Sequence, residues 1–460
     1  MQLSSDTIIA RATPAGKGAI AVVRISGTKA LGYMDQFLQQ PLSLKKSHTA
    51  YLRQIFDSEG LIDEALVILF KGQRSYTGED TVEISTHGSD YIVNRLIAAF
   101  LRLGARIAEP GEFTQRAFLN GKLDLAQAEA VADVIAAEHR FAHDNALKQL
   151  RGGFSGDISL LRDRLLHFTS LIELELDFGE EDVEFASRDE LTALVTGILD
   201  KVNALRDSFA LGNALKQGFT LVLAGRPNAG KSTLFNALLN EDKAIVSDIE
   251  GTTRDAIEDR LFIEGISLRL IDTAGIREAT DVIEQQGIAR TFKHIEKSGA
   301  TVYLFDVNQT PLDLVLSDVR EIQQKTDRVW VIANKMDGFE GSIDDFANPI
   351  EALTQWPMLS VSAKDRLTVN QLTQQLAQRF QSELVPLDDQ TVVTNARHAQ
   401  SLSDCSQELQ KILEGISANL TGDLLSFHLR SAIQALSAII GDMDHDEVLG
   451  NIFSKFCIGK

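Results

Sequence analysis

Residues 225–232 read GRPNAGKS, a glycine-rich segment that restricts the chain to a small set of folds. The segment fits the pattern G-x-x-x-x-G-K-[ST], and it lies between an apolar, β-branched run, TLVLA, and a helical run, TLFNALL. In this setting the glycines let backbone N–H groups wrap around phosphates, Lys231 reaches the β- and γ-phosphates, and Ser232 ligates Mg²⁺. A strand, a phosphate-binding loop and a helix in this order predict a parallel sheet with crossover helices.

A second motif, DTAG at residues 272–275, follows the apolar run LRLI. This position would place Asp272 near the Mg²⁺ shell and the Gly275 N–H beside a γ-phosphate. Between the two motifs, GTTRD occupies the place of a switch loop, where a threonine completes Mg²⁺ coordination when the γ-phosphate is present. We assign that role to Thr253.

Two more motifs identify the base. NKMD at residues 334–337 follows the run RVWVIA, and there the Asp337 carboxylate can accept hydrogen bonds from the N1–H and the exocyclic amine of guanine. Adenine offers an acceptor at N1 and would leave this carboxylate unpaired. SAK at residues 362–364 follows the run MLSV, where a backbone N–H could meet the guanine O6. Four motifs in this order predict a guanine-nucleotide site.

The residue after DTAG departs from the common pattern. GTPases usually place a glutamine there to position the hydrolysing water, but this chain has Ile276. Either hydrolysis is slow, or another polar residue positions the water. The polar residues that follow closely are Arg277, Glu278, Asp281 and Glu284, and spacing alone does not choose among them.

The overall composition limits the compartment and the partners. Two cysteines, Cys405 and Cys457, cannot form a disulfide framework or a four-thiolate zinc site, so we expect a reducing compartment, the cytoplasm. We find neither a signal-peptide pattern nor about eighteen consecutive apolar residues, so we expect no membrane span. The formal charge of −20 argues against binding nucleic acid alone through a broad basic face, because phosphate contacts need clustered Lys and Arg.

The periodicity of apolar residues divides the 460 residues into four segments. Short β-branched runs and one periodic helix at 90–103 predict an α+β domain over 1–121. Helical periodicity follows over 122–217, strand and helix patterns alternate over 218–382, and helical periodicity resumes over 383–460. We therefore expect a nucleotide domain inserted into a helical domain whose two halves pack on each other. The apolar faces expected in the first helical segment comprise Leu125, Ala128, Val131, Val134 and Ile135, and later Leu160, Leu161, Leu165, Leu166 and Leu171.

Further motifs run the length of the chain: DTIIA, VVRISG, SYTGED, PGEFTQRAFLNGKLDLAQAEA and the terminal FCIGK. Together with GRPNAGKS, GTTRD, DTAGIRE, NKMD and SAK, they closely resemble the MnmE (TrmE) family of tRNA-modification GTPases. The nucleotide motifs alone specify only a GTPase, whereas the N-terminal and C-terminal motifs specify the family. The resemblance implies a multidomain α+β and α/β protein: an N-terminal folate-binding domain that looks like an aminomethyltransferase, a helical domain, and an inserted Ras-like P-loop GTPase domain.

The resemblance also implies a homodimer formed through the N-terminal domain, and a site for 5-formyltetrahydrofolate or a related tetrahydrofolate. Arg24, Glu83, Lys122 and Lys460 match the family's folate positions. By chemistry alone, a basic cluster suits the glutamate tail of a folate and Glu83 suits donors on a pterin ring, although without the resemblance surface salt bridges would be the simpler explanation. Cys457 is either a nucleophilic thiol or a small packed residue, and the sequence leaves both readings open.

A potassium ion beside the phosphates is implied as well, held by Asn228, Ser247, Ile249 and Thr252. Such an ion can stand in for an arginine finger, because it offsets the negative charge that develops at the β–γ bridge. Glu284 matches the residue that positions the hydrolytic water. The two G domains of the dimer are expected to pair when GTP and potassium are bound.

The predicted GTP-binding residues lie in the four motifs and in the switch segment, with Ser232 and Thr253 as the Mg²⁺ ligands and Arg254 as a further candidate. They are Asn228, Ala229, Gly230, Lys231, Ser232, Thr233, Ser247, Asp248, Ile249, Glu250, Gly251, Thr252, Thr253, Asp272, Thr273, Ala274, Gly275, Asn334, Lys335, Asp337, Ser362, Ala363 and Lys364.

The function that the resemblance implies is a potassium-activated GTPase that acts with an FAD-dependent partner, MnmG (GidA). The pair would place an aminomethyl or carboxymethylaminomethyl group on carbon 5 of the wobble uridine of certain tRNAs, with one carbon from a folate. Two alternatives stay open at this stage. One is an assembly GTPase, for example in ribosome maturation, and the other is a one-carbon transferase whose G domain is only a regulatory gate.

Overall fold

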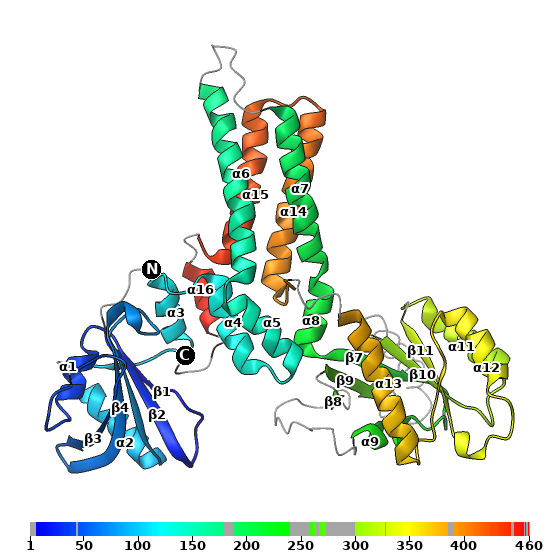
Figure 1. Cartoon of the computed structure of the whole chain (residues 1–460), viewed down its shortest axis with the longest axis horizontal. Helices are drawn as coiled ribbons and strands as arrows, with labels where there is room; N and C mark the ends of the chain where they lie inside the picture. The colour runs from blue at the N-terminus through cyan, green and yellow to red at the C-terminus, as the bar shows by residue number, and fades with distance from the viewer. Residues whose placement is uncertain are drawn as a thin grey trace, which may run out of the picture. The chain divides into compact units, whose positions relative to one another are not determined.

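The computed structural model describes residues 6–42, 45–177, 187–239, 258–263, 266–272, 300–326, 328–384, 391–442, 446–454, 456 and 459. The chain forms two compact units. Figure 1 labels the helices and strands of both. Unit 1 comprises Met1–Ile135, Ala146–Leu199 and Asp404–Lys460, and unit 2 comprises Ala136–Asn145 and Asp200–Ser403. None of the helices within the described ranges is long and apolar enough to cross a membrane.

Unit 1 begins with a six-stranded sheet in the order β3-β4-β5-β2-β1-β6. Its strands pair antiparallel except β1 with β6, which run parallel. The strands are β1 Ile8–Arg11, β2 Gly18–Ser26, β3 Ala50–Asp57, β4 Gly60–Phe70, β5 Thr81–Gly88 and β6 Arg106–Ile107, with the helices α1 Ala30–Asp35, η1 Gly72–Arg74, α2 Asp90–Arg102 and α3 Glu112–Leu119.

One face of this sheet is covered by α2. On β4, Val67 and Leu69 are buried with Leu96 and Phe100 of α2 in one apolar core, so the helix predicted at 90–103 is confirmed. Side chains alternate along a strand, and Leu66, which precedes Val67, is exposed on the opposite face. The α+β prediction for the N-terminal domain is thus confirmed. On the face opposite α2, Ile8 and Ala10 of β1 are buried with Phe113 of α3, while β2, β3 and β4 carry exposed apolar residues; we call this face the open face.

The helical part of unit 1 joins segments far apart in the sequence. In α6 (Gly153–Asp177) the carboxylate of Glu173 accepts hydrogen bonds from Ser426 Oγ at 3.4 Å and from Arg430 Nη2 at 2.6 Å, both in α15 (Gly422–Ile440). These two helices lie side by side in Figure 1, so the two helical halves pack on each other as the sequence predicts. The other helices outside the nucleotide-binding sheet are α4 Leu125–Ala136, α5 Arg140–Leu150, α7 Arg188–Asp207, α8 Phe209–Gln217, α14 Ala396–Ser417 and α16 Asp446–Phe453.

The apolar faces expected in these helices are only partly right. Leu161 and Leu165 of α6 are buried, but Leu160 and Leu166 are about half exposed. In α4, Leu125 is buried while Ile135, expected on the same face, is exposed. Residues at spacings of three and four share a face, but the width of the buried stripe depends on where the partner helix lies.

Unit 2 is built on a second six-stranded sheet in the order β12-β11-β10-β7-β9-β8. All neighbours are parallel except β8, which pairs antiparallel with β9. The elements are β7 Phe219–Ala224, α9 Lys231–Leu239, β8 Glu258–Ile263, β9 Ile266–Asp272, β10 Ala300–Asp306, α11 Leu312–Gln323, β11 Val329–Asn334, η2 Met336–Gly338, α12 Asp344–Thr354, β12 Leu359–Ser360 and α13 Arg366–Leu384.

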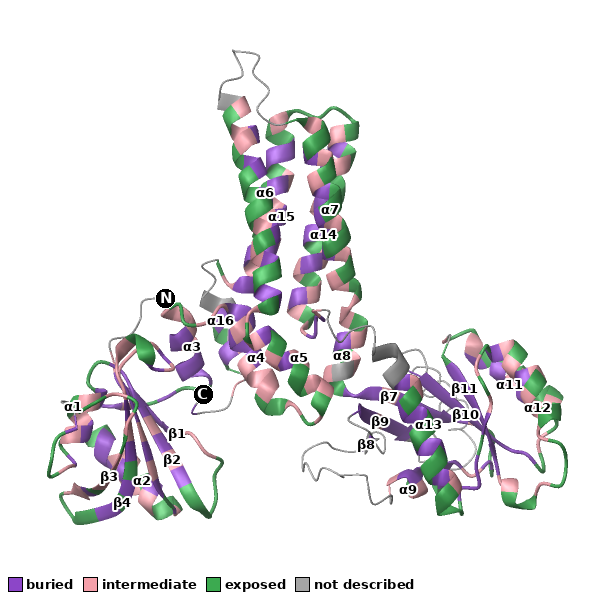
Figure 2. Ribbon diagram, in the orientation of Figure 1, coloured by how far each residue is buried: buried purple, intermediate pink, exposed green. Residues whose placement is uncertain are grey.

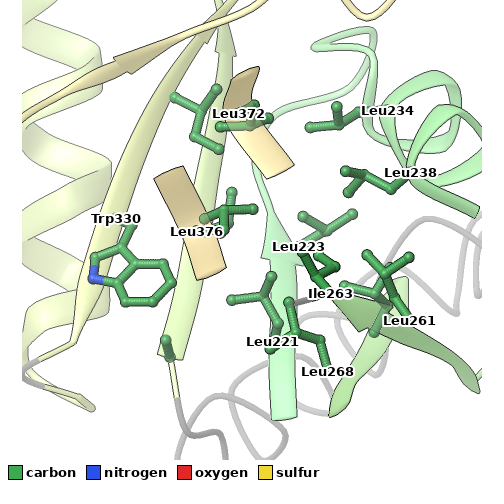
Figure 3. Close-up of a cluster of buried hydrophobic side chains, with 14 of the residues drawn as sticks. Leu221, Leu223, Leu234, Leu238, Leu261, Ile263, Leu268, Trp330, Leu372 and Leu376 are labelled. Atoms are coloured by element: carbon green, nitrogen blue, oxygen red, sulfur yellow. The ribbon is translucent and has the colours of Figure 1, made fainter. Parts of the chain in front are cut away.

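Helices cover both faces of this sheet. One apolar core gathers side chains of β7 and β9 with Leu234 and Leu238 of α9 and Leu372 and Leu376 of α13 (Figure 3). A second core on the opposite face includes Val315 of α11. The central strands β10 and β11 are buried at every position (Figure 2), which explains their continuous apolar runs. The predicted α/β domain with crossover helices is confirmed.

Candidate functional site

The phosphate-binding loop connects β7 to α9. Gly230 has φ 95°, and a Cβ at this position would lie 2.3 Å from Nδ2 of Asn334, so a larger residue would force the two loops apart. Asn334 Nδ2 donates a hydrogen bond to the Ala229 carbonyl oxygen at 2.8 Å. The first and third motifs of the sequence are therefore in direct contact.

Lys231 is the first residue of α9, and its side chain is buried. Its Nζ donates hydrogen bonds to the carbonyl oxygens of Gly225 at 2.8 Å and Arg226 at 2.9 Å, which places the ammonium inside the curve of the loop. Ser232 and Thr233 follow on the exposed first turn of the helix. A helix N-terminus with an ammonium beside it attracts anions, so this loop has the donors and the charge that fit a polyphosphate.

An ion pair fixes the start of the phosphate-binding loop, at Arg226. Arg226 donates to both carboxylate oxygens of Asp318 in α11, at 2.7 and 2.8 Å, and Tyr303 Oη donates to the same carboxylate at 2.5 Å. Burial works to raise the pKa of Asp318, but the hydrogen bonds from Arg226 and Tyr303 lower it below its ordinary value. The loop is thereby anchored to the helix that follows β10, a contact that the sequence motifs do not reveal.

The NKMD and SAK motifs meet at the ends of β11 and β12. Asn334 is buried, and its Oδ1 accepts a hydrogen bond from the Ala363 N–H at 3.1 Å. Ser362 Oγ donates to Asp337 Oδ1 at 2.6 Å, and this hydrogen bond, with the nearby positive charge of Lys364, lowers the pKa of Asp337. An ionised carboxylate held in this way is an acceptor for two donors of a base, as guanine offers and adenine does not.

Several predicted residues fall partly or wholly outside the described part of the chain. Asp272 ends β9 in register with Leu223 of β7, but only its backbone is described. The predicted residues that lie outside the described ranges are Ser247, Asp248, Ile249, Glu250, Gly251, Thr252, Thr253, Arg254, Thr273, Ala274, Gly275, Glu284, Cys457 and Lys460.

A second group of predicted residues lies on the open face of the N-terminal sheet. Arg24 of β2 faces Glu83 of β5 in register, and its Nη2 lies 2.8 Å from Glu83 Oε1. Arg24 Nη1 also donates to the carbonyl oxygen of Gly459 at 3.3 Å. The C-terminal tail therefore reaches the strand pair that carries the predicted folate positions Arg24 and Glu83. Gly459 is the sequence neighbour of Lys460, another predicted folate position.

Two aromatic rings that sequence reasoning missed flank Arg24. The guanidinium carbon lies 5.4 Å from the ring centre of Tyr76 and 5.6 Å from that of Phe113. Both residues belong to motifs that carried the family resemblance, SYTGED and PGEFTQ, and this was the available signal. Lys122 is exposed, and its Nζ donates to the carbonyl oxygen of Gln73 at 2.6 Å, at the start of the loop that holds Tyr76.

Comparisons with known proteins identify the family of the chain. A family model described as the GTP-binding protein TrmE N-terminus matches residues 7–122, and one described as the MnmE helical domain matches residues 125–457. A tRNA modification GTPase MnmE of Cytophaga hutchinsonii is 47% identical over 99% of this chain and 98% of its own length. That of Flavobacterium johnsoniae is 46% identical over the full length of both chains.

Among solved structures, the G domain of the T. maritima FeoB iron transporter covers 36% of this chain and 97% of its own, with 22% identity and a TM-score of 0.27, a similarity too low to carry a conclusion. The sequence relatives are decisive, because the identity extends over the whole chain, and the two family models together match residues 7–122 and 125–457. The chain belongs to the MnmE (TrmE) family of tRNA modification GTPases, and it is a GTP hydrolase that acts in tRNA modification.

Proposed function

We propose that this GTPase is activated by potassium and acts with an FAD-dependent partner of the MnmG (GidA) family. The two would modify carbon 5 of the wobble uridine of certain tRNAs, adding an aminomethyl or carboxymethylaminomethyl group with one carbon from a folate. GTP hydrolysis would drive a cycle in which the G domains of a homodimer pair and separate. The observation that best supports the nucleotide half of this proposal is the contact of Asn334 with both Ala229 and Ala363, which joins phosphate loop and base loops.

GTP would be held through its two ends. Lys231 and the N-terminus of α9 bind the phosphates, and Asp337 accepts from the guanine. Ser232, on the exposed first turn of α9, and Thr253 would hold Mg²⁺, which supplies positive charge at the phosphate oxygens when bound. Glu284 would position the hydrolytic water, since Ile276 cannot.

The potassium assignment rests on Asn228 together with Ser247, Ile249 and Thr252. Asn228 has φ 62°, in the left-handed region, which asparagine adopts more readily than most residues other than glycine, and its side chain is exposed on the phosphate-binding loop. We expect hydrolysis to be faster in potassium than in sodium chloride at equal ionic strength. Asn228→Ala should remove that difference while GTP binding persists, and equal rates of the wild-type protein in the two salts would exclude potassium activation.

The folate assignment is supported by the surroundings of Arg24. A guanidinium that is shared between Glu83 and the Gly459 carbonyl oxygen, and flanked by Tyr76 and Phe113, offers charge and flat apolar surface on one side of a sheet. A tetrahydrofolate has a planar ring with donors and an anionic tail, which are the complementary features. Lys122 and Lys460 would serve the same ligand from the neighbouring loop and the chain end.

The homodimer proposal is supported by apolar residues on the same open face. Leu52 and Leu66 are cross-strand partners of β3 and β4, with 59% and 40% exposure, and Ile20 of β2 is 65% exposed. A second copy of this face would remove them from water. The net charge of −20 supports the division of labour with a partner that carries most tRNA contacts, and the two cysteines suit the cytoplasm.

A further inference from the structure

The loop that contains Asp337 holds a residue in an unfavourable backbone conformation. Lys335, between β11 and the η2 turn, has φ 65° and ψ 39°, which lie in the left-handed region. A lysine gains no local hydrogen bond there, as asparagine or aspartate can, so this conformation persists only where other contacts hold it. Asp337 stands two residues further on, and the backbone direction at Lys335 therefore sets where its carboxylate points.

Two residues at the end of the neighbouring strand supply such contacts. Asp306 is the last residue of β10 and lies in register with Asn334 of β11, and its side chain is only 6% exposed. Its Oδ2 accepts a hydrogen bond from Lys335 Nζ at 2.7 Å. Asn308 holds the backbone of the same residue, because its Nδ2 donates to the Lys335 carbonyl oxygen at 3.0 Å. Lys335 is thus fixed at its side chain and at its main chain from one strand end.

The turn after β10 is itself closed by hydrogen bonds. The Asn308 N–H donates to Asp306 Oδ1 at 3.0 Å, so both oxygens of this buried carboxylate are used. The Thr310 N–H donates to the Asp306 carbonyl oxygen at 2.9 Å, and the Val307 N–H donates to the Asn334 carbonyl oxygen at 3.2 Å. Asp306 and Asn308 are therefore held in place relative to β11 before any nucleotide binds.

We propose that Asp306 and Asn308 are positioning residues for guanine recognition. They hold Lys335 in its left-handed conformation and thereby aim the Asp337 carboxylate at the base. Neither lies in a nucleotide-binding motif of the sequence, and they act through Lys335 without a contact to GTP of their own. This inference rests on the proposed role of Asp337 as the residue that binds guanine.

Nucleotide affinities of full-length Asp306→Asn and Asn308→Ala variants test the proposal. We would measure the dissociation constants of GTP, of inosine triphosphate, which lacks the exocyclic amine, and of inorganic tripolyphosphate, which has no base. GTP should bind about tenfold more weakly to Asp306→Asn, the size of one hydrogen bond to a charged group, and about fivefold more weakly to Asn308→Ala, which loses a hydrogen bond between neutral groups. In both variants the preference for GTP over inosine triphosphate should shrink. Tripolyphosphate affinity should not change, and the exposed Asp313→Asn of α11 is the charge-matched control expected to behave as wild type.

An unchanged preference for GTP over inosine triphosphate in both variants would overturn the proposal. Equal weakening of GTP and tripolyphosphate would overturn it too, because that result describes a distorted phosphate loop. Asp337→Asn separates this inference from the proposed function: if that variant keeps the guanine preference, the role of Asp337 itself fails. If Asp306→Asn does not fold, Asn308→Ala decides, since it removes one 3.0 Å hydrogen bond at the surface of the turn.

Discussion

Ser362 and Asp337 are 25 residues apart in the sequence, yet their side chains form a hydrogen bond of 2.6 Å that lowers the pKa of the Asp337 carboxyl. Arg226 and Asp318 are joined in the same way over 92 residues. The first, third and fourth motifs predicted residues that lie in contact, Ala229, Asn334 and Ala363, because these motifs follow strands that run parallel in one sheet. They could not predict the residues that hold the motifs in place, since such contacts depend on side-chain packing between strand ends.

At the scale of single residues, the sharpest prediction concerns Glu284, the residue proposed to position the hydrolytic water. Glu284→Ala should reduce the rate of GTP hydrolysis by at least about a hundredfold, because general-base positioning contributes that much, while the affinity for GTP stays within about threefold. Single-turnover hydrolysis and nucleotide binding measure the two quantities. Asp281→Ala is the matched control, since spacing alone does not separate the two acids; a normal rate in Glu284→Ala, or an equal loss in Asp281→Ala, would remove Glu284 from this role.

Single elements were predicted best where long apolar runs or strong periodicity left no alternative. The buried strands β7, β9 and β11 and the helix α2 lie where the sequence predicts them. The apolar faces of α4 and α6 were predicted less well, as the exposed Ile135, Leu160 and Leu166 show, because a helix face is buried only where another element covers it. The approach of the C-terminal tail to Arg24 could be expected only from the family resemblance, since no local pattern encodes it.

The ion pair between Arg95 of α2 and Asp57 of β3 leads to a prediction about how stability depends on pH. Asp57, at the end of β3, is buried and accepts hydrogen bonds from Arg95 of α2 at 2.6 and 3.0 Å, and these bonds lower its pKa to about 2. A carboxylate with a lowered pKa stabilises the folded state fully above its unfolded pKa, about 4, and that contribution is lost as the pH falls through about 2.

Asp57→Asn should therefore destabilise α2 by about 2 kcal/mol at neutral pH, the usual cost of hydrogen bonds lost from a charged pair. Hydrogen exchange of the α2 amides, in the variant and in the wild type at each pH, would measure this loss of stability. The difference in stability between the two proteins should decrease as the pH falls below about 4. A difference that stays constant down to pH 3 or lower would assign the effect to packing and not to ionisation.

At the scale of the whole molecule, the chain combines a GTPase with a proposed second site on the N-terminal sheet. The nucleotide-binding segment lies in the sequence between two helical segments that pack together. The proposed folate site and the proposed dimer contact share one sheet. Arg24 and Glu83 of the folate site lie on β2 and β5, and Leu52 and Leu66 of the dimer contact lie on β3 and β4. The family was predictable from the sequence because its motifs are distributed over the full length.

The proposed dimer contact can be tested by placing one charged residue on the open face of the N-terminal sheet. Leu66→Glu should convert a dimer into a monomer in sedimentation experiments at micromolar concentration, because a buried carboxylate without a partner costs several kcal/mol. Leu314→Glu, at an exposed leucine of α11 with 41% exposure, is the control that should leave the dimer intact. A monomeric wild-type protein, or a Leu66→Glu variant that still dimerises, would show that this face is not the contact.

Mass spectrometry of tRNA nucleosides, from cells with and without this chain, tests the central claim most directly. We expect 5-substituted wobble uridines to disappear on deletion, to return with the wild-type chain, and to stay absent with Glu284→Ala. An unchanged nucleoside profile on deletion would contradict a role in wobble-uridine modification, and full restoration by the Glu284→Ala variant would contradict its dependence on hydrolysis at this site.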